Sequence, residues 1–500
     1  MDTESIIKLD LFINQTDVPS GNYFEVRDPG RFANVIAQVA VGSAAHVHEA
    51  VSAAHNAYQT WKHSGMSQRI ERLNCAALEL EKLSSQLAQT LVQEQGMLLR
   101  DTQRDVANGI RTLRETAALA TSFFEVKEFE DEEGWVRVEK VPRGVVAAIV
   151  PWNAPMGLTM GKVGPALATG NTIVVKPSPF APVAVSQALK AMAACFPPGV
   201  INIVYGEADV GTALTHHPLV RKISFTGGTR TGTAVMAAAA ESIKNIGLEL
   251  GGNDPAIVLD DIVPAEVVPE LLKGIFSRSG QFCYAIKRLY VPASIYDKFY
   301  DTLCEAVNEY KVGYGLDPRS TLAPLNNQNQ YNFIKGLTQR TRQSGAVVRE
   351  LGQKLDPDHW DHGYYVLPAV VRDVSPTAEL VVNEQFGPII PLIPYESEQQ
   401  VLAMANSTEY GLASSIWSHD YDRASRLAGE IEAGTTFINS HARTALGDRH
   451  MPFGGVKQSG IGRVRTTVGM DEYIEYHAIN LNKKTIPSTK KVTPQNAKQS

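Results

Sequence analysis

The sequence has few cysteines and no spacing that would bind zinc or build a disulfide framework. Its four cysteines, Cys75, Cys195, Cys283 and Cys304, include no C-x-x-C pair, and its twelve histidines include no H-x-x-x-H spacing. We therefore expect neither a metal site nor a disulfide framework. Free thiols are typical of a reducing, cytoplasmic compartment, which is the localisation that we expect.

The sequence also lacks an excess of positive charge and a long apolar stretch. Its 47 basic and 53 acidic residues give a net charge of -6, which argues against nucleic acid or an anionic membrane as the main partner. The first fifteen residues carry acids where a signal peptide needs a basic region. The longest apolar run in the middle of the chain, residues 145–151, is too short to span a bilayer. The composition, 500 residues of which 44% are hydrophobic, is typical of a globular protein with two or three domains.

The N-terminal part predicts helices followed by one isolated strand. Apolar residues recur at steps of three and four through residues 47–61 and 70–91, which is typical of helices with one buried face. Gly96 is expected to end the second helix as its C-cap, and a third helical pattern covers residues 106–124. Residues 135–141 alternate between valine and polar residues, which predicts a strand with one face buried, outside the main domain.

From residue 145 the pattern changes to short apolar strands separated by helical segments. This alternation is typical of βαβ units that build a parallel sheet covered on both faces. We expect strands of the first such sheet at residues 145–150, 172–176, 200–205, 222–226 and 245–250. A second α/β region follows residue 251, with strands near 256–259, 288–291, 389–395 and 414–417 and helices near 295–310 and 328–344.

Polar residues follow three of these predicted strands. Asn153 lies between two prolines that restrict the backbone, so its amide is suited to donate to an oxyanion. Glu249 ends an otherwise apolar strand, where a carboxylate must be paired or tuned for proton transfer. Lys176 follows a strand at the edge where open α/β sheets bind ligands, although a surface lysine is the other interpretation of this position.

Two further features allow a functional and a purely structural interpretation. Gly227 and Gly228 join a predicted strand to a helix, an arrangement that presents backbone N–H groups to a phosphate or simply makes a tight connection. Cys283, within the stretch FSRSGQFCYAIKR, is either a small buried apolar residue or a nucleophile. The local residues alone do not decide between these interpretations.

Six motifs in order carry a resemblance to a known family. They are KPS, FTGGTRTG, LELGGN, GQFC, NEQFGP and PFGGVKQSGIGR, and with them the chain resembles the NAD(P)-dependent aldehyde dehydrogenase superfamily over about residues 22–476. The resemblance implies an α/β fold with a Rossmann-type dinucleotide domain, an α/β catalytic domain and a small β oligomerisation flap. The implied boundaries are residues 1–120 and 143–249, residues 250–470, and residues 121–142 with 471–485, followed by a flexible tail at 486–500.

The resemblance also implies a mechanism. Cys283 attacks the aldehyde as a thiolate, and the Asn153 amide and the Cys283 backbone N–H stabilise the oxyanion of the thiohemiacetal. Loss of hydride leaves a thioester, and Glu249 acts as general base for the water that hydrolyses it. The residues that the resemblance assigns to the cofactor are Lys176, Ser178, Gly206, Gly227, Gly228, Glu384 and Phe386.

Three positions depart from the pattern of the family near the cofactor and the base. Pro179 stands where relatives that prefer NAD often carry a glutamate, so we predict use of NAD with measurable use of NADP. Val464 replaces a common glutamate that shares a proton path with a lysine matching Lys162, so that path is in doubt here. Tyr284 is larger than the usual neighbour of the nucleophile and is expected to crowd the thiol.

Other departures predict a wide substrate tunnel. Ala154 and Gly161 occupy positions where relatives often carry aromatic residues. The stretch 439–453 is about three residues longer than usual and contains His441, Arg443, Arg449 and His450. We therefore expect a bulky aldehyde, aromatic or polycyclic, with an acidic or polar substituent.

Two other functional classes are compatible with this fold. A relative that transfers the acyl group to coenzyme A would not need Glu249, and a non-catalytic binding protein would not need thiol, base and oxyanion donor together. The resemblance further implies that the flap completes a sheet in a partner subunit, giving a homodimer or homotetramer. An intrachain hairpin is the other interpretation of the flap.

Overall fold

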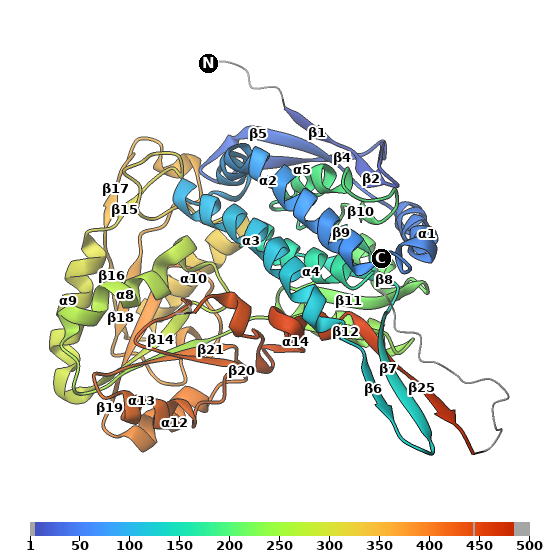
Figure 1. Ribbon diagram of the computed structural model, residues 1–500. Coiled ribbons are helices and arrows are strands. Elements are labelled where there is room, and N and C mark those ends of the chain that lie inside the picture. The colour runs from blue at the N-terminus through green and yellow to red at the C-terminus, as the bar shows by residue number, and fades with distance from the viewer. Residues whose placement is uncertain (1–5, 444–445, 485–500) are drawn as a thin grey trace.

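The computed structural model describes residues 6–443 and 446–484. These residues form two large sheets with helices on their faces, and a narrow flap that projects from the body (Figure 1). The α/β class predicted from the sequence is confirmed. The predicted tail at 486–500 lies outside the described residues.

The first sheet is built around parallel strands in the order β12-β11-β8-β9-β10. In that order their bounds are Asn245–Glu249, Val220–Thr226, Val145–Ile149, Thr172–Lys176 and Ile201–Ile203. Each strand overlaps one of the predicted apolar runs. Antiparallel strands extend both edges: β24 (Gly460–Ile461) pairs with β12, and β2 (Leu11–Ile13) and β3 (Thr16–Val18) lie beyond β10. These edge strands are too short to be predicted from periodicity.

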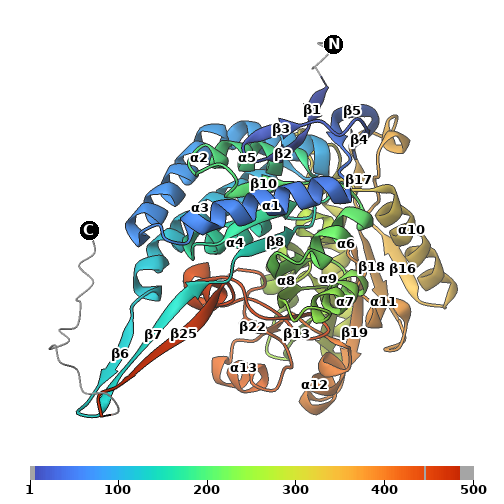
Figure 2. The same cartoon turned by 90° about the vertical axis from the view of Figure 1, so that its right-hand side faces the viewer.

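Helices cover both faces of this sheet. One face packs against α1 (Ala44–Trp61), α6 (Ala208–His216) and α7 (Thr229–Ala240) (Figure 2). The other face packs against α4 (Pro155–Ala168) and α5 (Val183–Ala193), with α2 (Met66–Gln95) and α3 (Leu99–Phe123) outside them. Gly96 ends α2 in the left-handed conformation, as predicted. No helix in the described ranges is long and apolar enough to cross a bilayer.

The second sheet carries the predicted nucleophile just before its central strand. Its order is β16 (Val347–Glu350), β18 (Ala369–Arg372), β19 (Ile389–Tyr395), β14 (Ile286–Pro292), β13 (Asp254–Val258), β21 (Ala413–Trp417) and β22 (Thr435–Ile438), all parallel except β16. Alternate residues of β13 face opposite sides, because strand side chains have a period of two. Val258 packs with α8 (Pro264–Phe276) and α9 (Tyr296–Asn308), and Ile257 packs with α10 (Gln328–Gln343), α12 (Glu398–Asn406) and α13 (Tyr421–Ala428).

Smaller elements complete the described chain. A separate sheet near the N-terminus has the order β1 (Ile7–Leu9), β5 (Arg31–Ala40) and β4 (Tyr23–Asp28). Two-stranded ribbons join β15 (Lys311–Val312) to β17 (Gln353–Lys354) and β20 (Tyr410–Gly411) to β23 (Val456–Lys457). The short helices α11 (Glu379–Val382) and α14 (Thr466–Asp471) follow β18 and β24.

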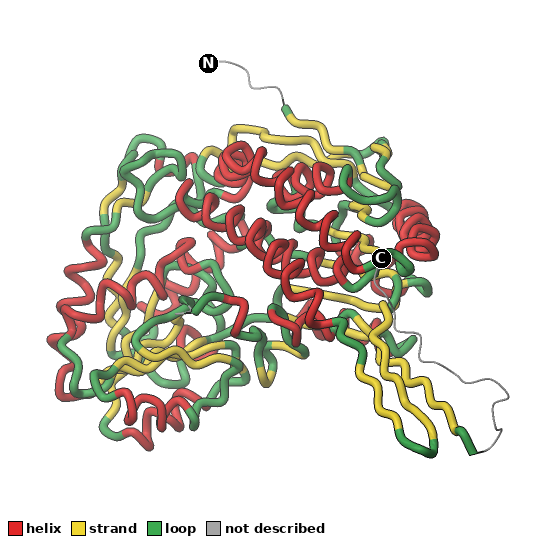
Figure 3. Tube along the Cα trace, viewed as in Figure 1, coloured by secondary structure: helices red, strands yellow, loops and turns green. Residues whose placement is uncertain are grey.

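The flap consists of β25 (Ile474–Asn482), β7 (Gly134–Pro142) and β6 (Lys127–Glu130) in antiparallel order, and it extends away from both large sheets (Figure 3). The alternating pattern of β7 predicted one buried face, but every residue of β7 is only partly buried. The prediction is wrong within one subunit because no other layer of the described residues packs on the projecting flap. Phe129 and Tyr476 remain 64% and 59% exposed there.

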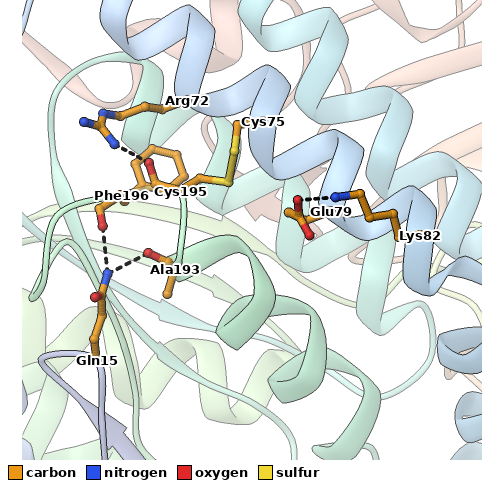
Figure 4. Close-up of a disulfide and its surroundings, with 8 residues drawn as sticks. All are labelled: Gln15, Arg72, Cys75, Glu79, Lys82, Ala193, Cys195 and Phe196. Carbon is orange, nitrogen blue, oxygen red and sulfur yellow. Dashed lines mark hydrogen bonds and ion pairs between the residues drawn. A yellow bond between two sulfur atoms is a disulfide. The ribbon is translucent and has the colours of Figure 1, made fainter.

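The expectation of no disulfide is wrong for one pair, because Cys75 and Cys195 are bonded (Figure 4). Cys75 lies on α2, which packs against α5, and Cys195 lies in the turn that follows α5. Arg72 donates to the carbonyl of Cys195, and the side-chain amide of Gln15 donates to two other carbonyls of the same turn. The bonded cysteines are 120 residues apart, so helix packing and not a sequence motif brings them together. Only Cys283 and Cys304 remain as the free thiols that a reducing compartment favours.

Candidate active site

Cys283 lies in a rigid turn between the short 3-10 helix Ser277–Gly280 and β14. Arg278 and Ser279 both have left-handed backbone conformations, with φ of 53° and 57°. Residues other than glycine rarely adopt this conformation. Hydrogen bonds hold this conformation: Arg278 donates to the carbonyl of Asn153 (2.8 Å), and Ser279 donates to the carbonyl of Ala323 (2.8 Å). The strained turn therefore fixes the thiol relative to the loop that carries Asn153.

A buried lysine anchors the other side of the turn. Lys287 is 2% exposed, and its ammonium donates to the backbone carbonyls of Cys283 and of Phe282 (3.2 Å). It also forms an ion pair with Glu384 at 3.1 Å, and Glu384 in turn accepts from the backbone N–H of Gly252. Lys287 thus links the nucleophile turn to a glutamate that the sequence assigned to the cofactor.

Cys283 stands between two cavities. The first cavity, about 170 Å³, lies between α3, α4 and the loop before α14. The second cavity, about 290 Å³, lies between the ends of β8 and β11 and the segment 384–386. Asn153, Thr226 and Cys283 line both cavities, whereas Glu249 lines the first only. A molecule in either cavity therefore reaches the same sulfur from a different side.

Glu249 is the carboxylate that the first cavity shares with the thiol. It ends β12 opposite Thr226 of β11, is 7% exposed, and its Oε2 has no hydrogen-bond partner among the described residues. Burial raises the pKa of Glu249 above its usual range, and the nearby Lys162 opposes this shift. Burial likewise lowers the pKa of Lys162 below its usual range. A carboxyl with a raised pKa and a free oxygen is suited to exchange protons near neutral pH.

The surroundings of Cys283 favour its thiol over the thiolate. Burial raises its pKa to about 12, and the charges of Glu384, Glu249 and Asp254 add to this effect, while Lys287 opposes it. A base must therefore accept the proton before the sulfur can attack.

The predicted cofactor residues form two groups. Gly227, Gly228, Glu384 and Phe386 line the second cavity, where the ring of Phe386 packs edge-on against Trp152 at 5.6 Å. The other three residues do not line this cavity: Lys176 ends β9, Ser178 follows β9, and Gly206 follows β10. Both groups lie at the carboxyl edge of the first sheet, where such sheets bind ligands.

This edge has the features that a dinucleotide needs. The backbone N–H groups at the start of α7 are open, because Gly228 caps the helix without any capping bond from a described side chain. A side chain at Gly206 would place its Cβ 2.3 Å from Val210, so only glycine lets the backbone turn here. Burial lowers the pKa of Lys176 to about 8, and the carboxylates Glu207 and Asp209 oppose that shift.

The wall that the sequence predicted to be wide belongs to the first cavity. Ala154, Gly161 and Tyr284 line it, and a Cβ added to Gly161 would have no heavy atom within 4 Å. The ring of Tyr284 packs against Phe453 with ring centroids 5.0 Å apart, so it forms a wall beside the thiol.

The long loop 439–453 contributes less to this cavity than expected. Arg449 lines it, but Arg443 and His450 do not, and His441 is buried, where it bonds the carbonyl of Tyr284 (2.7 Å). Residues 444–445 of the loop lie outside the described residues. The cavity thus receives one arginine of this loop instead of a cluster of basic side chains.

Several residues of the site were not identified from the sequence. Lys287, Arg278 and Thr226 anchor or line the site, and none of them was assigned a role, although they lie within the stretches FSRSGQFCYAIKR and FTGGTRTG. Lys287 did carry a signal, because a lysine within the apolar strand IKRLYVP must be paired if it is buried. The contacts of Arg278 depend on the left-handed turn, which the sequence does not reveal.

Comparisons with known proteins agree with this geometry. The model of the aldehyde dehydrogenase family matches residues 16–479. The chain is 34% identical to 3-sulfolactaldehyde dehydrogenase of Pseudomonas putida over 94% of this chain and 96% of that protein. It is 36% identical to the mitochondrial succinate-semialdehyde dehydrogenase of Arabidopsis thaliana over 93% and 86%. A crystal structure of betaine aldehyde dehydrogenase from Staphylococcus aureus in complex with NAD+ superimposes with a TM-score of 0.91 and 30% identity, covering 96% of this chain and 95% of that one.

Proposed function

Because this chain belongs to the aldehyde dehydrogenase family, we propose that it oxidises a bulky aldehyde to the carboxylic acid with NAD(P)+ through covalent intermediates on Cys283. The observation that carries this proposal is the position of Cys283, Asn153 and Thr226 on both cavities. An aldehyde in the first cavity and a hydride acceptor in the second would meet at the thiol. Glu249, on the aldehyde side only, is suited to activate the water that completes the reaction.

In the proposed mechanism the protein groups transfer protons and stabilise the charge that develops. The Cys283 thiol loses its proton to water, and the sulfur then forms a bond to the aldehyde carbon while the carbonyl becomes an oxyanion. The Asn153 amide and the Cys283 backbone N–H donate to that oxyanion. Collapse of the thiohemiacetal expels hydride and leaves a thioester. Glu249 then takes a proton from water, whose oxygen attacks the thioester carbon and displaces the Cys283 sulfur.

The residues present fit a dinucleotide at the carboxyl edge of the first sheet. The open N–H groups of α7 with Gly227 and Gly228 suit a pyrophosphate, Lys176 and Glu384 suit ribose hydroxyls, and Phe386 suits a nicotinamide face. When bound, the nicotinamide supplies the hydride acceptor.

The bulky substrate follows from the wide wall at Gly161 and from the charges at the first cavity. Arg278 pairs with Asp105 and Arg465 pairs with Asp448, whereas Arg449 has no carboxylate partner among the described residues. A substrate carboxylate or sulfonate would supply one. The names of two similar proteins, 3-sulfolactaldehyde and succinate-semialdehyde dehydrogenase, denote aldehydes that carry such an acidic group.

A panel of aldehydes tests this proposal. We expect kcat/KM for an aromatic aldehyde with an acidic substituent to exceed that for acetaldehyde by at least about tenfold, measured as NADH formation with and without coenzyme A. Coenzyme A should not accelerate the reaction or appear in the product.

With NADP+ we expect a lower but measurable rate, within about 1000-fold of NAD+, because Pro179 supplies no carboxylate while Glu207 and Asp209 lie near Lys176.

Matched variants test the bulk of the substrate and its acidic substituent separately. Gly161→Phe fills the open wall, so it should reduce kcat/KM for the aromatic aldehyde and leave that for acetaldehyde nearly unchanged. Arg449→Met should reduce the preference for the acidic substituent, and Arg443→Met, which removes an exposed arginine outside the cavity, should not. A wild-type preference for acetaldehyde would refute the bulky substrate.

We also propose that the flap joins two subunits, as a homodimer or homotetramer. The exposed apolar side chains of the flap, Phe129 and Tyr476 among them, would be covered by a partner. Gel filtration should give an apparent mass of at least twice 54.5 kDa, and substitution of both residues by Ser should shift the protein toward the monomer. A wild-type monomer would favour the intrachain hairpin.

A further inference from the structure

Glu249 and Lys162 are both buried, and the charge of each acts on the pKa of the other. They are 7% and 2% exposed. In the proposed function Glu249 takes a proton from water once in each turnover, so it must release that proton before the next. The first cavity then still contains the substrate or product, which leaves no clear route for the proton on that side.

A third cavity lies directly behind this pair. Its volume of about 10 Å³ is enough for about one water molecule. It shares Lys162, Glu249 and Val464 with the first cavity. Of its lining residues, Glu472 is the only acid besides Glu249. The third cavity thus provides a polar space between the catalytic carboxylate and a second one.

Two sets of hydrogen bonds border this space, one at Ser224 and one at Glu472. The Lys162 ammonium donates to the hydroxyl of Ser224 at 3.1 Å, and the phenol of Tyr473 donates to the same hydroxyl at 3.3 Å. On the far side, Lys222 donates to Glu472 at 3.1 Å. One water in the third cavity would close the remaining gap between these groups.

Glu472 also lines a fourth cavity, which leads to the surface at the base of the flap. This cavity of about 440 Å³ is bounded by Arg143, Asp471 and Val468, and Val468 is 48% exposed. The side chain of Glu472 is itself 25% exposed. Glu472 therefore stands where the buried polar space meets solvent.

We propose that Glu472 delivers the proton of Glu249 to solvent through Lys162, Ser224 and the third cavity, away from the substrate. Each transfer breaks one O–H or N–H bond and forms another. The Lys162 ammonium gives a proton, through the Ser224 hydroxyl and a water in the third cavity, to the Glu472 carboxylate, which releases it to bulk water. The neutral Lys162 amine that remains then takes the proton of Glu249. Lys222 positions Glu472 by their ion pair. This inference rests on the proposed function of Glu249.

The charges around the path support transfer in both directions. Burial moves the pKa values of Glu249 and Lys162 toward each other, and it lowers that of Lys222 to about 8. The other charges that act on Glu249 are those of Arg463, Arg465 and Glu472, and Arg143 acts on Lys222. Donors and acceptors of similar pKa exchange protons with little free-energy difference.

The test compares Glu472→Gln with Glu475→Gln. Glu475 lies three residues away and pairs with Arg143, but it lines neither of the two cavities. We expect Glu472→Gln to slow hydrolysis of the acyl-enzyme by at least about tenfold, while the first turnover still releases one NADH per active site. Imidazole, which is small enough for the fourth cavity, should restore the rate, and Val464→Glu should restore it by placing a carboxylate on the shared wall.

The outcomes distinguish a failure of the proton path from a failure of the proposed function. Equal hydrolysis rates in Glu472→Gln and Glu475→Gln, or a loss that neither imidazole nor Val464→Glu restores, would refute the proton path. Absence of an NADH burst from the wild-type protein with any aldehyde would instead refute the proposed function. If Glu472→Gln does not fold, Ser224→Ala carries the test, and an unchanged hydrolysis rate in that variant would also refute the path.

Discussion

Replacing Cys283 with serine should reduce NADH formation by about 10⁴-fold or more, with the protein still folded. A hydroxyl is a weaker nucleophile than a thiolate and starts from a much higher pKa. The same burial that raises the pKa of the Cys283 thiol to about 12 would raise that of a hydroxyl further. Steady-state NADH formation with a bulky aldehyde measures the loss, and circular dichroism checks the fold.

Cys304 provides the matched control for this variant. It is the other free cysteine of the described chain and is buried in α9 within the core of the second sheet, where it lines neither cavity at the nucleophile. Cys304→Ser should keep most of the activity. A Cys283→Ser variant with about a tenth of the wild-type rate would contradict nucleophilic catalysis by this sulfur.

Replacing Glu249 with glutamine should reduce the steady-state rate by about 10²-fold to 10⁴-fold and leave the amplitude of the first turnover near one NADH per active site. The amide cannot accept a proton from water, so the acyl-enzyme should accumulate. Rapid mixing with saturating cofactor and aldehyde measures the amplitude and the following steady state separately. A variant that loses the amplitude in proportion to the rate would contradict a role in hydrolysis.

The pH dependence of acyl-enzyme hydrolysis should follow from the titration of Glu249. Burial raises the pKa of Glu249, so its ionised form, which acts as the base, is gained only as the pH rises through that raised value. Lys162, Arg463 and Arg465 favour the ionised form, and Glu472 disfavours it. The rate of hydrolysis should therefore increase with pH in the wild type. Glu249→Gln should lack this increase, whereas Glu241→Gln, which removes an exposed acid of the same sheet region, should retain it.

The sequence predicted the central strands closely because they are short apolar runs bounded by turn residues. The predicted strands at 172–176 and 389–395 match β9 and β19 residue for residue. It did not predict β24, a two-residue strand that pairs with β12 and brings the chain near residue 460 beside Glu249. Such pairing depends on segments about 200 residues apart in the chain, which local periodicity does not register.

The motifs named the candidate residues, and the tertiary structure shows how these residues are held. Cys283, Asn153 and Glu249 came from the sequence and line one cavity. The Lys287 contacts with the nucleophile turn depend on burial that no local pattern revealed. The disulfide was missed because Cys75 and Cys195 meet only through the packing of α2 against α5. For the flap, the sequence pattern was correct about the strand and wrong about its burial within one chain.

The central claim is that the reaction passes through an acyl group on Cys283 that Glu249 helps to hydrolyse. Intact-mass and peptide measurements on Glu249→Gln, mixed with cofactor and one aldehyde and stopped after the first turnover, test it directly. We predict that the protein gains the mass of one acyl group in place of one hydrogen, and that the peptide containing Cys283 carries it. An unmodified Cys283 in a sample that has released one NADH per active site would contradict the account.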